Sequence, residues 1–237
     1  GPSWSPDSSK VAYTDNRNKL WSIDIATGKN TEIDQAVYTG PNVDIRPRWS
    51  PDSKWITWAR DLDSHMQAVF LYNLETGTKT QITDGLSNAK SPIFDRDGKH
   101  LYFFASTNTG PAASWLDMTS LTNPIVTSSM YCVVLRKDLP HPLQPESDEE
   151  GAPKAAPGAA KAELPKFGID LEDIDHRIIA LPMGAADYRG LEPGPAGGFF
   201  GLPPPPRGGG GGGLAPGRGP PTPRGAGGAR AAGPVTS

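Results

Sequence analysis

Hydrophobic and polar residues alternate in short segments over the first half of the chain. In residues 21–25 every second side chain is apolar, and residues 70–74 repeat this alternation. An apolar residue at every second position is typical of a β-strand with one buried face. Each segment is followed by a Thr-Gly pair, at 27–28 and 76–77, and glycine readily takes the positive φ of a tight hairpin turn. The pattern therefore predicts antiparallel β-hairpins.

A second motif recurs with a period of 45 residues. Segments 4–10, 49–54 and 94–99 read Trp-Ser-Pro-Asp-Ser-Ser-Lys, Trp-Ser-Pro-Asp-Ser-Lys and Phe-Asp-Arg-Asp-Gly-Lys. Each begins with an aromatic residue and has aspartate at its fourth position, where a turn favours a carboxylate that accepts hydrogen bonds from nearby amides. The residues that define the repeat are Trp4, Asp7, Trp49, Asp52, Phe94 and Asp97.

One repeat unit contains strand, turn, strand, loop, strand, turn and strand. Four antiparallel strands in a unit of about 45 residues are typical of one blade of a β-propeller. We therefore predict an all-β fold, a partial β-propeller of about three to four four-stranded antiparallel blades. The predicted blades span about residues 4–48, 49–93, 94–166 and 167–202, with a flexible insertion at 144–166, in one domain 1–202.

An unrelated β-sandwich with similar hairpins is the alternative fold. A β-sandwich does not explain why three copies of one motif keep the same register. A propeller of so few blades is open, because closed propellers have about four to eight. We expect its uncovered end faces to leave Trp4 and Trp21 partly exposed.

Composition changes after residue 193. The chain has 28 Gly and 26 Pro, and six consecutive glycines follow Arg207. Such a segment has little apolar surface to offset the conformational entropy lost on ordering. We expect residues 203–237 to be a disordered low-complexity tail, and the small number of blades leads us to expect a fragment of a longer chain.

The charge of the chain argues against nucleic acid as a partner. The net charge is −3, and residues 194–237 contribute four arginines and no acid, so the remainder is acidic. Nucleic acids are bound by clustered Lys and Arg. No apolar stretch is long enough to span a membrane, and we expect a cytoplasmic location, with the periplasm as the alternative.

The motifs resemble a known family of propeller repeats. Trp-Ser-Pro-Asp repeats occur in TolB, in the propeller of prolyl oligopeptidases and in tricorn-type peptidases. Residues 135–138, Leu-Arg-Lys-Asp, lead into a charged insertion, and residues 169–182 then read Ile-Asp-x-x-x-Ile-x-x-Arg-Ile-x-x-Leu-Pro. This succession is similar to the second propeller of bacterial tricorn-type serine peptidases.

The resemblance implies a function and partners. In that family the propellers are not catalytic, and one of them is thought to filter extended peptides on their way to the peptidase domain. The resemblance implies a noncatalytic propeller segment that gates peptide access in proteolysis. Its partners would be peptides or proteins, the remaining blades and the peptidase domain. A TolB-like scaffold for protein–protein interaction is the alternative, and the propeller of a prolyl oligopeptidase is a third possibility.

The sequence offers few candidates for chemistry. It has no Gly-x-Ser-x-Gly motif and no phosphate-binding loop, so we assign no catalytic residue and leave open whether the chain is part of an enzyme. The single cysteine, Cys132, lies in an apolar run and is predicted to be a core residue. Arg46, Arg48 and Arg60 lie near blade junctions, where guanidinium groups can bind peptide carboxylates or carbonyls. Surface charge and hydrogen bonds between blades are the alternative role for them.

We predict no metal and no cofactor. The four histidines lack the spacing of metal ligands, and residues 95–98, Asp-Arg-Asp-Gly, lack the distal glutamate of a calcium loop. The repeat assigns Asp97 to a hairpin turn instead. The histidines are His65, His100, His141 and His176.

Overall fold

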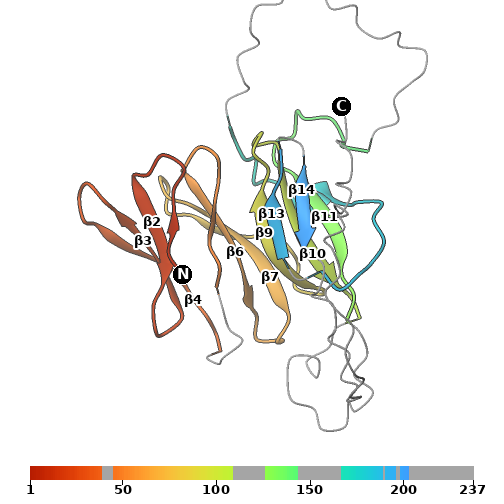
Figure 1. The fold of residues 1–237 in the computed structure, drawn as a ribbon, viewed down its shortest axis with the longest axis horizontal. Coiled ribbons are helices and arrows are strands. Elements are labelled where there is room, and N and C mark those ends of the chain that lie inside the picture. Colours follow the sequence, from red (N-terminus) through yellow and green to blue (C-terminus); the bar gives the residue numbers. More distant parts are fainter. Residues whose placement is uncertain (39–44, 109–125, 144–166, 189, 196–197, 203–237) are drawn as a thin grey trace, which may run out of the picture.

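The chain forms three four-stranded antiparallel sheets and a two-stranded hairpin (Figure 1). The computed structural model describes residues 1–38, 45–108, 126–143, 167–188, 190–195 and 198–202. The prediction of an all-β fold built from four-stranded antiparallel sheets is confirmed. The predicted insertion at 144–166 and the predicted tail at 203–237 lie outside the described residues.

The first sheet contains the first copy of the repeat. It consists of β1 (Ser3–Trp4), β2 (Lys10–Thr14), β3 (Lys19–Asp24) and β4 (Asn30–Gln35), in that spatial order. Consecutive strands are joined by tight turns, so each strand pairs with the one before it in the sequence. This order is the meander expected when every connection is a hairpin.

The second sheet repeats the first. It consists of β5 (Arg48–Trp49), β6 (Trp55–Asp61), β7 (Gln67–Asn73) and β8 (Lys79–Gln81), again in sequence order. Most of β7 is buried, because both faces of this sheet pack against a neighbouring sheet. A strand that is covered on two sides has apolar residues at consecutive positions, as in Ala-Val-Phe-Leu-Tyr.

The third sheet differs from the prediction. It consists of β9 (Asn88–Phe94), β10 (His100–Ser106), β11 (Ser129–Val134) and β12 (Ile178–Ala180). We predicted that blade three ends at residue 166 and that residues 167–202 form blade four. Instead, β12 pairs with β11 and completes the third sheet. The chain between residues 134 and 178 therefore connects the third and fourth strands of one sheet, and the short 3₁₀ turn Asp175–Arg177 leads into the outer strand.

A hairpin follows the third sheet. Its strands are β13 (Gly190–Pro193) and β14 (Phe199–Leu202), which pair only with each other among the described residues. Leu191 of this hairpin is buried against the outer face of the third sheet, beside Phe104 and Met130. Of the predicted fourth blade, residues 178–180 thus belong to the third sheet, and the strands described after them form one hairpin.

The repeat-defining aromatic residues occupy equivalent positions. Each aromatic residue is the last residue of the first strand of its sheet, which we call the inner strand. It lies opposite the aliphatic residue seven positions later. These cross-strand pairs are Trp4–Val11, Trp49–Ile56 and Phe94–Leu101. The 45-residue period thus corresponds to one four-stranded sheet.

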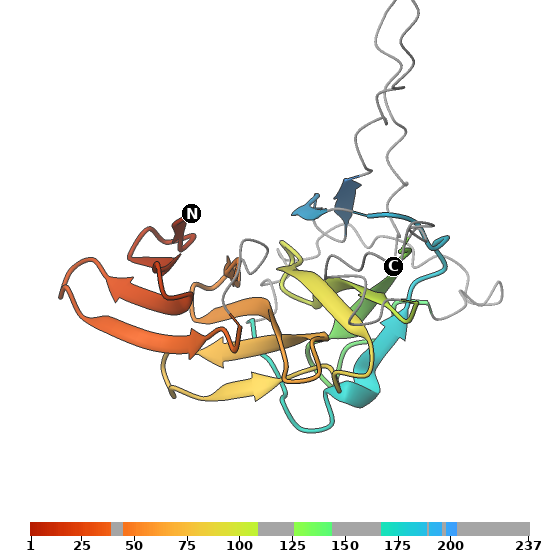
Figure 2. The same ribbon diagram turned by 90° about the horizontal axis from the view of Figure 1, so that it is seen from below.

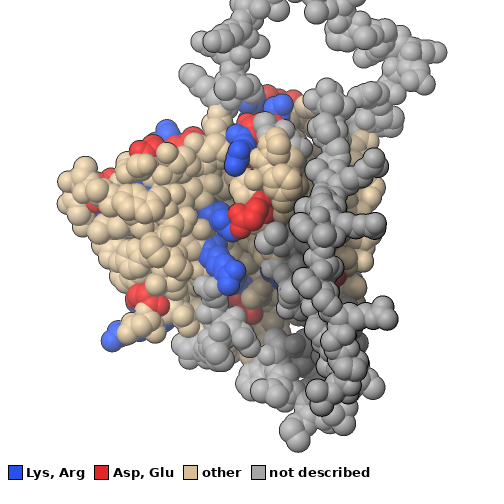
Figure 3. All heavy atoms as spheres, in the orientation of Figure 1, with Lys and Arg blue, Asp and Glu red and all other residues tan. Residues whose placement is uncertain are grey.

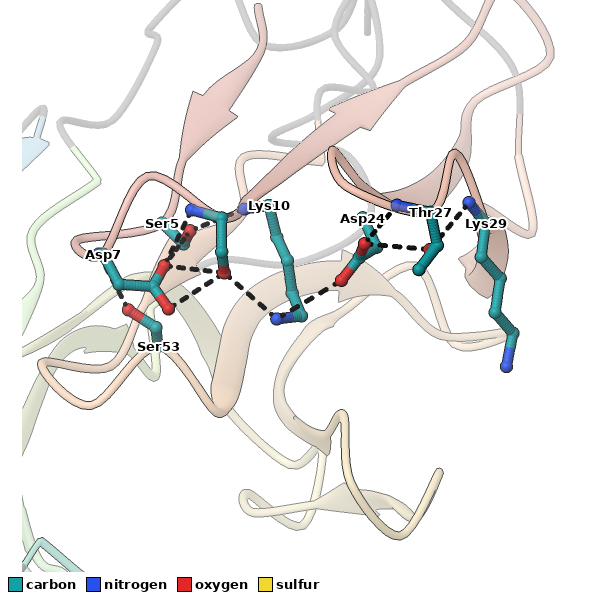
Figure 4. A network of polar contacts seen from close by, with 8 residues as sticks. Ser5, Asp7, Lys10, Asp24, Thr27, Lys29 and Ser53 are labelled. Carbon is teal, nitrogen blue, oxygen red and sulfur yellow. Dashed lines mark hydrogen bonds and ion pairs between the residues drawn. The ribbon is translucent and has the colours of Figure 1, made fainter.

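The repeat-defining aspartates hold the first turn of each sheet. Each carboxylate accepts a hydrogen bond from the backbone amide two residues further on. The amide-to-carboxylate distances are 3.0 Å for Asp7, 3.2 Å for Asp52 and 2.9 Å for Asp97. Hydrogen bonds from the Ser5 hydroxyl and the Ser9 amide hold the pKa of Asp7 well below its ordinary value of 3.8. Figure 4 shows Asp7 between Ser5 of its own turn and Ser53 of the next sheet.

The core consists of layers between the sheets. Trp58 and Phe70 fill the layer between the first and second sheets, and Leu71 and Phe103 fill the layer between the second and third. Cys132 lies in the layer between the third sheet and the hairpin, is fully buried as predicted, and burial raises its pKa to about 12. No helix in the described part of the chain has the length and hydrophobicity to cross a membrane.

Candidate functional site

The inner strands of the sheets lie next to one another. β1, β5, β9 and β13 are each the first strand of their sheet or hairpin, and β5 contacts β1 on one side and β9 on the other. The Trp49 indole fixes the first of these contacts, since its Nε1 donates a hydrogen bond to the Ser3 carbonyl at 2.9 Å. The inner strands therefore form one continuous surface, which in a propeller faces the axis.

Two of the three predicted arginines lie on this surface. Arg46 and Arg48 flank Pro47 at the start of β5, and together with residues 1–3 these residues line a cavity of ≈ 320 Å³. Arg46 is exposed, Pro47 is buried and Arg48 is half-buried, and both arginines line the same cavity. The cavity is lined mainly by polar and backbone groups, without a large hydrophobic side chain.

An ion pair connects this cavity to the hairpin. Arg48 Nη2 lies 2.8 Å from Glu192 Oε1 on β13, and their side chains are 39% and 48% exposed. Figure 3 shows basic and acidic side chains next to each other near the middle of this face. An ion pair with this much exposure stabilises the fold by less than about 1 kcal/mol, so a ligand can displace one partner easily.

The third predicted arginine has a structural role. Arg60 Nε donates a hydrogen bond to Asp34 at 2.8 Å, and its guanidinium lies 4.6 Å from the centre of the Phe70 ring. Asp34 is on β4 of the first sheet, and it also accepts hydrogen bonds from Trp58 Nε1 at 3.0 Å and Lys79 Nζ at 2.7 Å. Arg60 thus joins the first two sheets, away from Arg46 and Arg48. This matches the alternative role, hydrogen bonding between blades.

The fold also brings together residues that the sequence analysis treated separately. Ligand-capable atoms of Asp95, Asp97 and His100 all lie within 4.8 Å of one another. His100 Nδ1 is 3.8 Å from Asp95 Oδ2, which also accepts a hydrogen bond from the Tyr102 hydroxyl at 3.3 Å. Lys99 Nζ lies 3.7 Å from Asp97. Both carboxylates therefore have protein partners, and the hairpin-turn role predicted for Asp97 is the one observed.

Sequence reasoning missed Glu192 and Asp34. The signal for Glu192 was the segment 191–193, Leu-Glu-Pro, which has the apolar residue and the proline of Trp49-Ser50-Pro51 at the same spacing. This partial match lacks the aspartate of the repeat, because Gly194 stands at that position. Asp34 had no such signal, because its partners lie 24 to 45 residues further along the chain.

These observations define the class of protein. Repeated four-stranded sheets with adjacent inner strands make this chain a segment of a β-propeller. Its sequence matches the family described as the tricorn protease second beta propeller domain over residues 1–198. The chain belongs to this family, as its motifs indicated.

The relatives are named as tricorn-like proteases, and the chain matches one part of each. Tricorn protease homolog 1 of Streptomyces coelicolor is 25% identical over 190 residues, which cover 78% of this chain and 17% of that protein. The tricorn protease homolog of Saccharolobus solfataricus is 24% identical over 184 residues, covering 78% of this chain and 15% of the relative. Each match spans a fifth or less of the relative's length.

The fold agrees with a solved relative. The crystal structure of the tricorn protease superposes with a TM-score of 0.60 at 21% identity, covering 81% of this chain and 18% of the other. At this identity the match supports the propeller fold. It carries no information on the role of individual residues.

Proposed function

We propose that the chain is a noncatalytic propeller segment of a tricorn-like serine peptidase, and that its inner strands gate or guide extended peptides. The observation that carries this proposal is the placement of Arg46 and Arg48 together around one open cavity on the inner surface. The relatives that the chain matches are named as tricorn proteases, which supports a role in proteolysis.

The cavity fits the chemistry of a peptide terminus. A guanidinium group binds a carboxylate through two parallel hydrogen bonds and binds carbonyl oxygens through one. The exposed carboxylate of Glu192 already accepts one hydrogen bond from Arg48 Nη2, at 2.8 Å. A peptide carboxylate can take the place of Glu192, while Arg46 supplies further positive charge beside it. Because the lining is polar, it offers contacts to the backbone and terminus of a peptide. These contacts do not depend on the side chains of that peptide.

Peptide binding to the chain tests this function. A fluorescent extended peptide with a free C-terminal carboxylate is titrated with the chain, and anisotropy gives the Kd. We expect Arg46→Ala and Arg48→Ala each to weaken binding about threefold to fivefold, as expected for exposed charge pairs. Amidation of the peptide terminus should have a similar effect.

A matched control is available on the first sheet. Arg17 is an exposed arginine in the β2–β3 turn, away from the inner strands, so Arg17→Ala should leave the Kd unchanged. Equal affinity of the original chain, the two cavity variants and the amidated peptide would rule out a role for these arginines in peptide contact.

A further inference from the structure

Three equivalent turns join the first two strands of the three sheets. They span residues 5–10, 50–55 and 95–100. In each turn the amide of the fourth residue donates a hydrogen bond to the carbonyl of the first, at 2.9 to 3.1 Å. The fourth residue has a positive φ each time, 61° at Ser8, 62° at Ser53 and 73° at Gly98. The turns therefore share one backbone conformation, and their side chains can be compared position by position.

A serine supports the aspartate in the first two turns. Ser5 Oγ donates a hydrogen bond to Asp7 at 2.6 Å, as Figure 4 shows, and the equivalent bond in the second turn is 2.5 Å long. The third turn has Asp95 in place of the serine. An ionised carboxylate has no proton to donate. Asp95 and Asp97 therefore bring two negative groups together where the other turns pair a hydroxyl with one carboxylate.

The third turn also ends differently, on a histidine. His100 replaces Lys10 of the first turn and Trp55 of the second. Ligand-capable atoms of Asp95, Asp97 and His100 all lie within 4.8 Å of one another. His100 Nδ1 is buried and has no hydrogen-bond partner in the part of the chain that the structure describes. A buried polar atom of this kind costs free energy unless a ligand supplies the missing partner.

The cluster is largely shielded from water. The side chain of Asp95 is 0% exposed, that of His100 15% and that of Asp97 17%. The third sheet lies between the second sheet and the β13–β14 hairpin (Figures 1 and 2). Tyr102, which packs against Phe199 of the hairpin, donates a hydrogen bond to Asp95 Oδ2 at 3.3 Å. Two carboxylates repel each other more strongly where water is excluded, so this setting favours a bound cation.

We propose that Asp95, Asp97 and His100 bind one divalent transition-metal ion of the zinc type. Zn²⁺ takes ligands from carboxylate oxygens and imidazole nitrogens, and three protein ligands leave its fourth position to water. A carboxylate offers about four acceptor positions, so the hydrogen bonds described for the two aspartates leave room for a metal. None of these residues lines the peptide cavity, so the site stands or falls independently of the proposed function.

The mixed ligands favour zinc over calcium. Ca²⁺ takes about six to eight oxygen ligands, whereas this turn offers an imidazole and two carboxylates. Imidazole suits Zn²⁺ and its neighbours among the transition metals. The expectation of no metal was based on the spacing between histidines and on the pattern of a calcium loop. Neither pattern describes two aspartates and one histidine in a single turn.

Titration of the whole chain with Zn²⁺ tests the site. A chelator first removes bound metal and is dialysed away, and isothermal titration calorimetry then gives the stoichiometry and the Kd. We expect one site per chain, and we expect Zn²⁺ to raise the Tm, because a ligand that binds only the folded chain stabilises it. Co²⁺ should give the visible absorption of an ion with nitrogen and oxygen ligands, and Zn²⁺ should abolish that absorption. Millimolar Ca²⁺ should not displace the Zn²⁺.

The first turn supplies a matched variant. Asp95→Ser with His100→Lys gives the third turn the residues of the first at both positions, and the first turn forms with them. The variant should therefore fold, which its thermal unfolding without metal checks. Its Zn²⁺ Kd should rise at least about tenfold, because losing even a partner of a metal ligand costs about that much. Asp97→Asn, a second variant, keeps an oxygen that can accept the Lys99 amide bond and should weaken binding similarly. His176→Gln is the control, since the loss of this exposed histidine should leave the Kd unchanged.

Two results would overturn the proposal. One is the same Zn²⁺ Kd in the original chain and in the site variants, which would assign the binding to other groups such as the exposed His176. The other is the absence of heat and of a change in Tm when Zn²⁺ is added to the original chain. That result would mean that a protonated His100 neutralises Asp95 instead, across the 3.8 Å between His100 Nδ1 and Asp95 Oδ2.

Discussion

At the scale of single residues, buried or hydrogen-bonded aspartates hold turns and sheets in place. Asp7 caps a turn through hydrogen bonds with Ser5 and Ser9. Asp34 joins two sheets, and its side chain is only 4% exposed. A carboxylate suits both roles because it offers two acceptor oxygens and binds charged donors more strongly than a neutral group does.

Removal of Asp34 should destabilise the chain strongly. In Asp34→Ala the Arg60 guanidinium, whose side chain is 15% exposed, loses its carboxylate, and so does the Trp58 indole. We expect a loss of about 3 to 5 kcal/mol in the free energy of unfolding, as for other broken buried ion pairs. Urea denaturation measures this loss. Lys54→Ala breaks the exposed pair with Glu75 and should destabilise the chain far less than Asp34→Ala does. Similar losses in both variants would contradict the structural role of Asp34.

Asp7 should make stability depend on acid pH. Its folded pKa is lowered by hydrogen bonds from Ser5 and Ser9, so its contribution is present above the ordinary value of 3.8 and is lost as pH falls below it. Asp7→Asn should therefore destabilise the chain at about pH 6, with a smaller difference from the original chain at about pH 3. Denaturant unfolding at both pH values measures the difference. Asp63→Asn, in an exposed loop, is the control, and a pH-independent effect of Asp7→Asn would refute the assignment.

At the scale of elements, each sheet is a local meander, but its stability depends on its neighbours. The hairpin turns place consecutive strands side by side. A sheet with two apolar faces is not stable in water by itself, and here the layers between sheets bury those faces. Phe103 illustrates this dependence, since it is 2% exposed between the second and third sheets and stacks on Tyr131 at 5.5 Å.

Truncation of Phe103 should therefore cost far more than truncation of an exposed apolar residue. We expect Phe103→Ala to lower the free energy of unfolding by about 3 to 5 kcal/mol, since it leaves a cavity between two sheets. Leu86 is 81% exposed, so Leu86→Ala should change stability by less than about 0.5 kcal/mol. Thermal or urea denaturation compares the two variants. A small effect of Phe103→Ala would mean that the layer collapses around the gap.

At the scale of the whole molecule, the sheets form a row in which the core layers lie between neighbours (Figure 1). Asp34 acts in the layer between the first and second sheets, and Phe103 acts in the next layer. The two residues lie in different layers, and the described partners of Asp34 are Trp58, Arg60 and Lys79. The free energy of such a row is approximately a sum over units and their interfaces.

Substitutions in different layers should therefore be additive. We expect the double variant Asp34→Asn with Phe103→Leu to lose the sum of the two single losses, within about 0.5 kcal/mol. These mild substitutions keep enough folded chain for urea denaturation to be measured. As a contrast, Asp34→Asn with Arg60→Gln affects one ion pair and should depart from additivity. Strong coupling between Asp34 and Phe103 would show that the sheets respond as one rigid unit.

Local patterns in the sequence determined much of this fold. The alternation in residues 21–25 and 70–74 predicted strands, and the period of Trp4, Trp49 and Phe94 predicted equivalent sheets. These predictions succeed because a strand and its hairpin turn depend on neighbouring residues, whose spacing is visible in the sequence. The family motifs of residues 169–182 likewise identified the tricorn propeller.

Only the tertiary structure decided which distant residues meet. Residues 178–180 complete the third sheet across a long insertion, although the repeat spacing placed them in a fourth blade. Arg48 meets Glu192 across 144 residues, and Arg60 is held by Asp34 instead of facing the inner surface. No period in the sequence encodes these pairs, because they depend on how the sheets stack, and the stacking is set by packing of side chains across the layers.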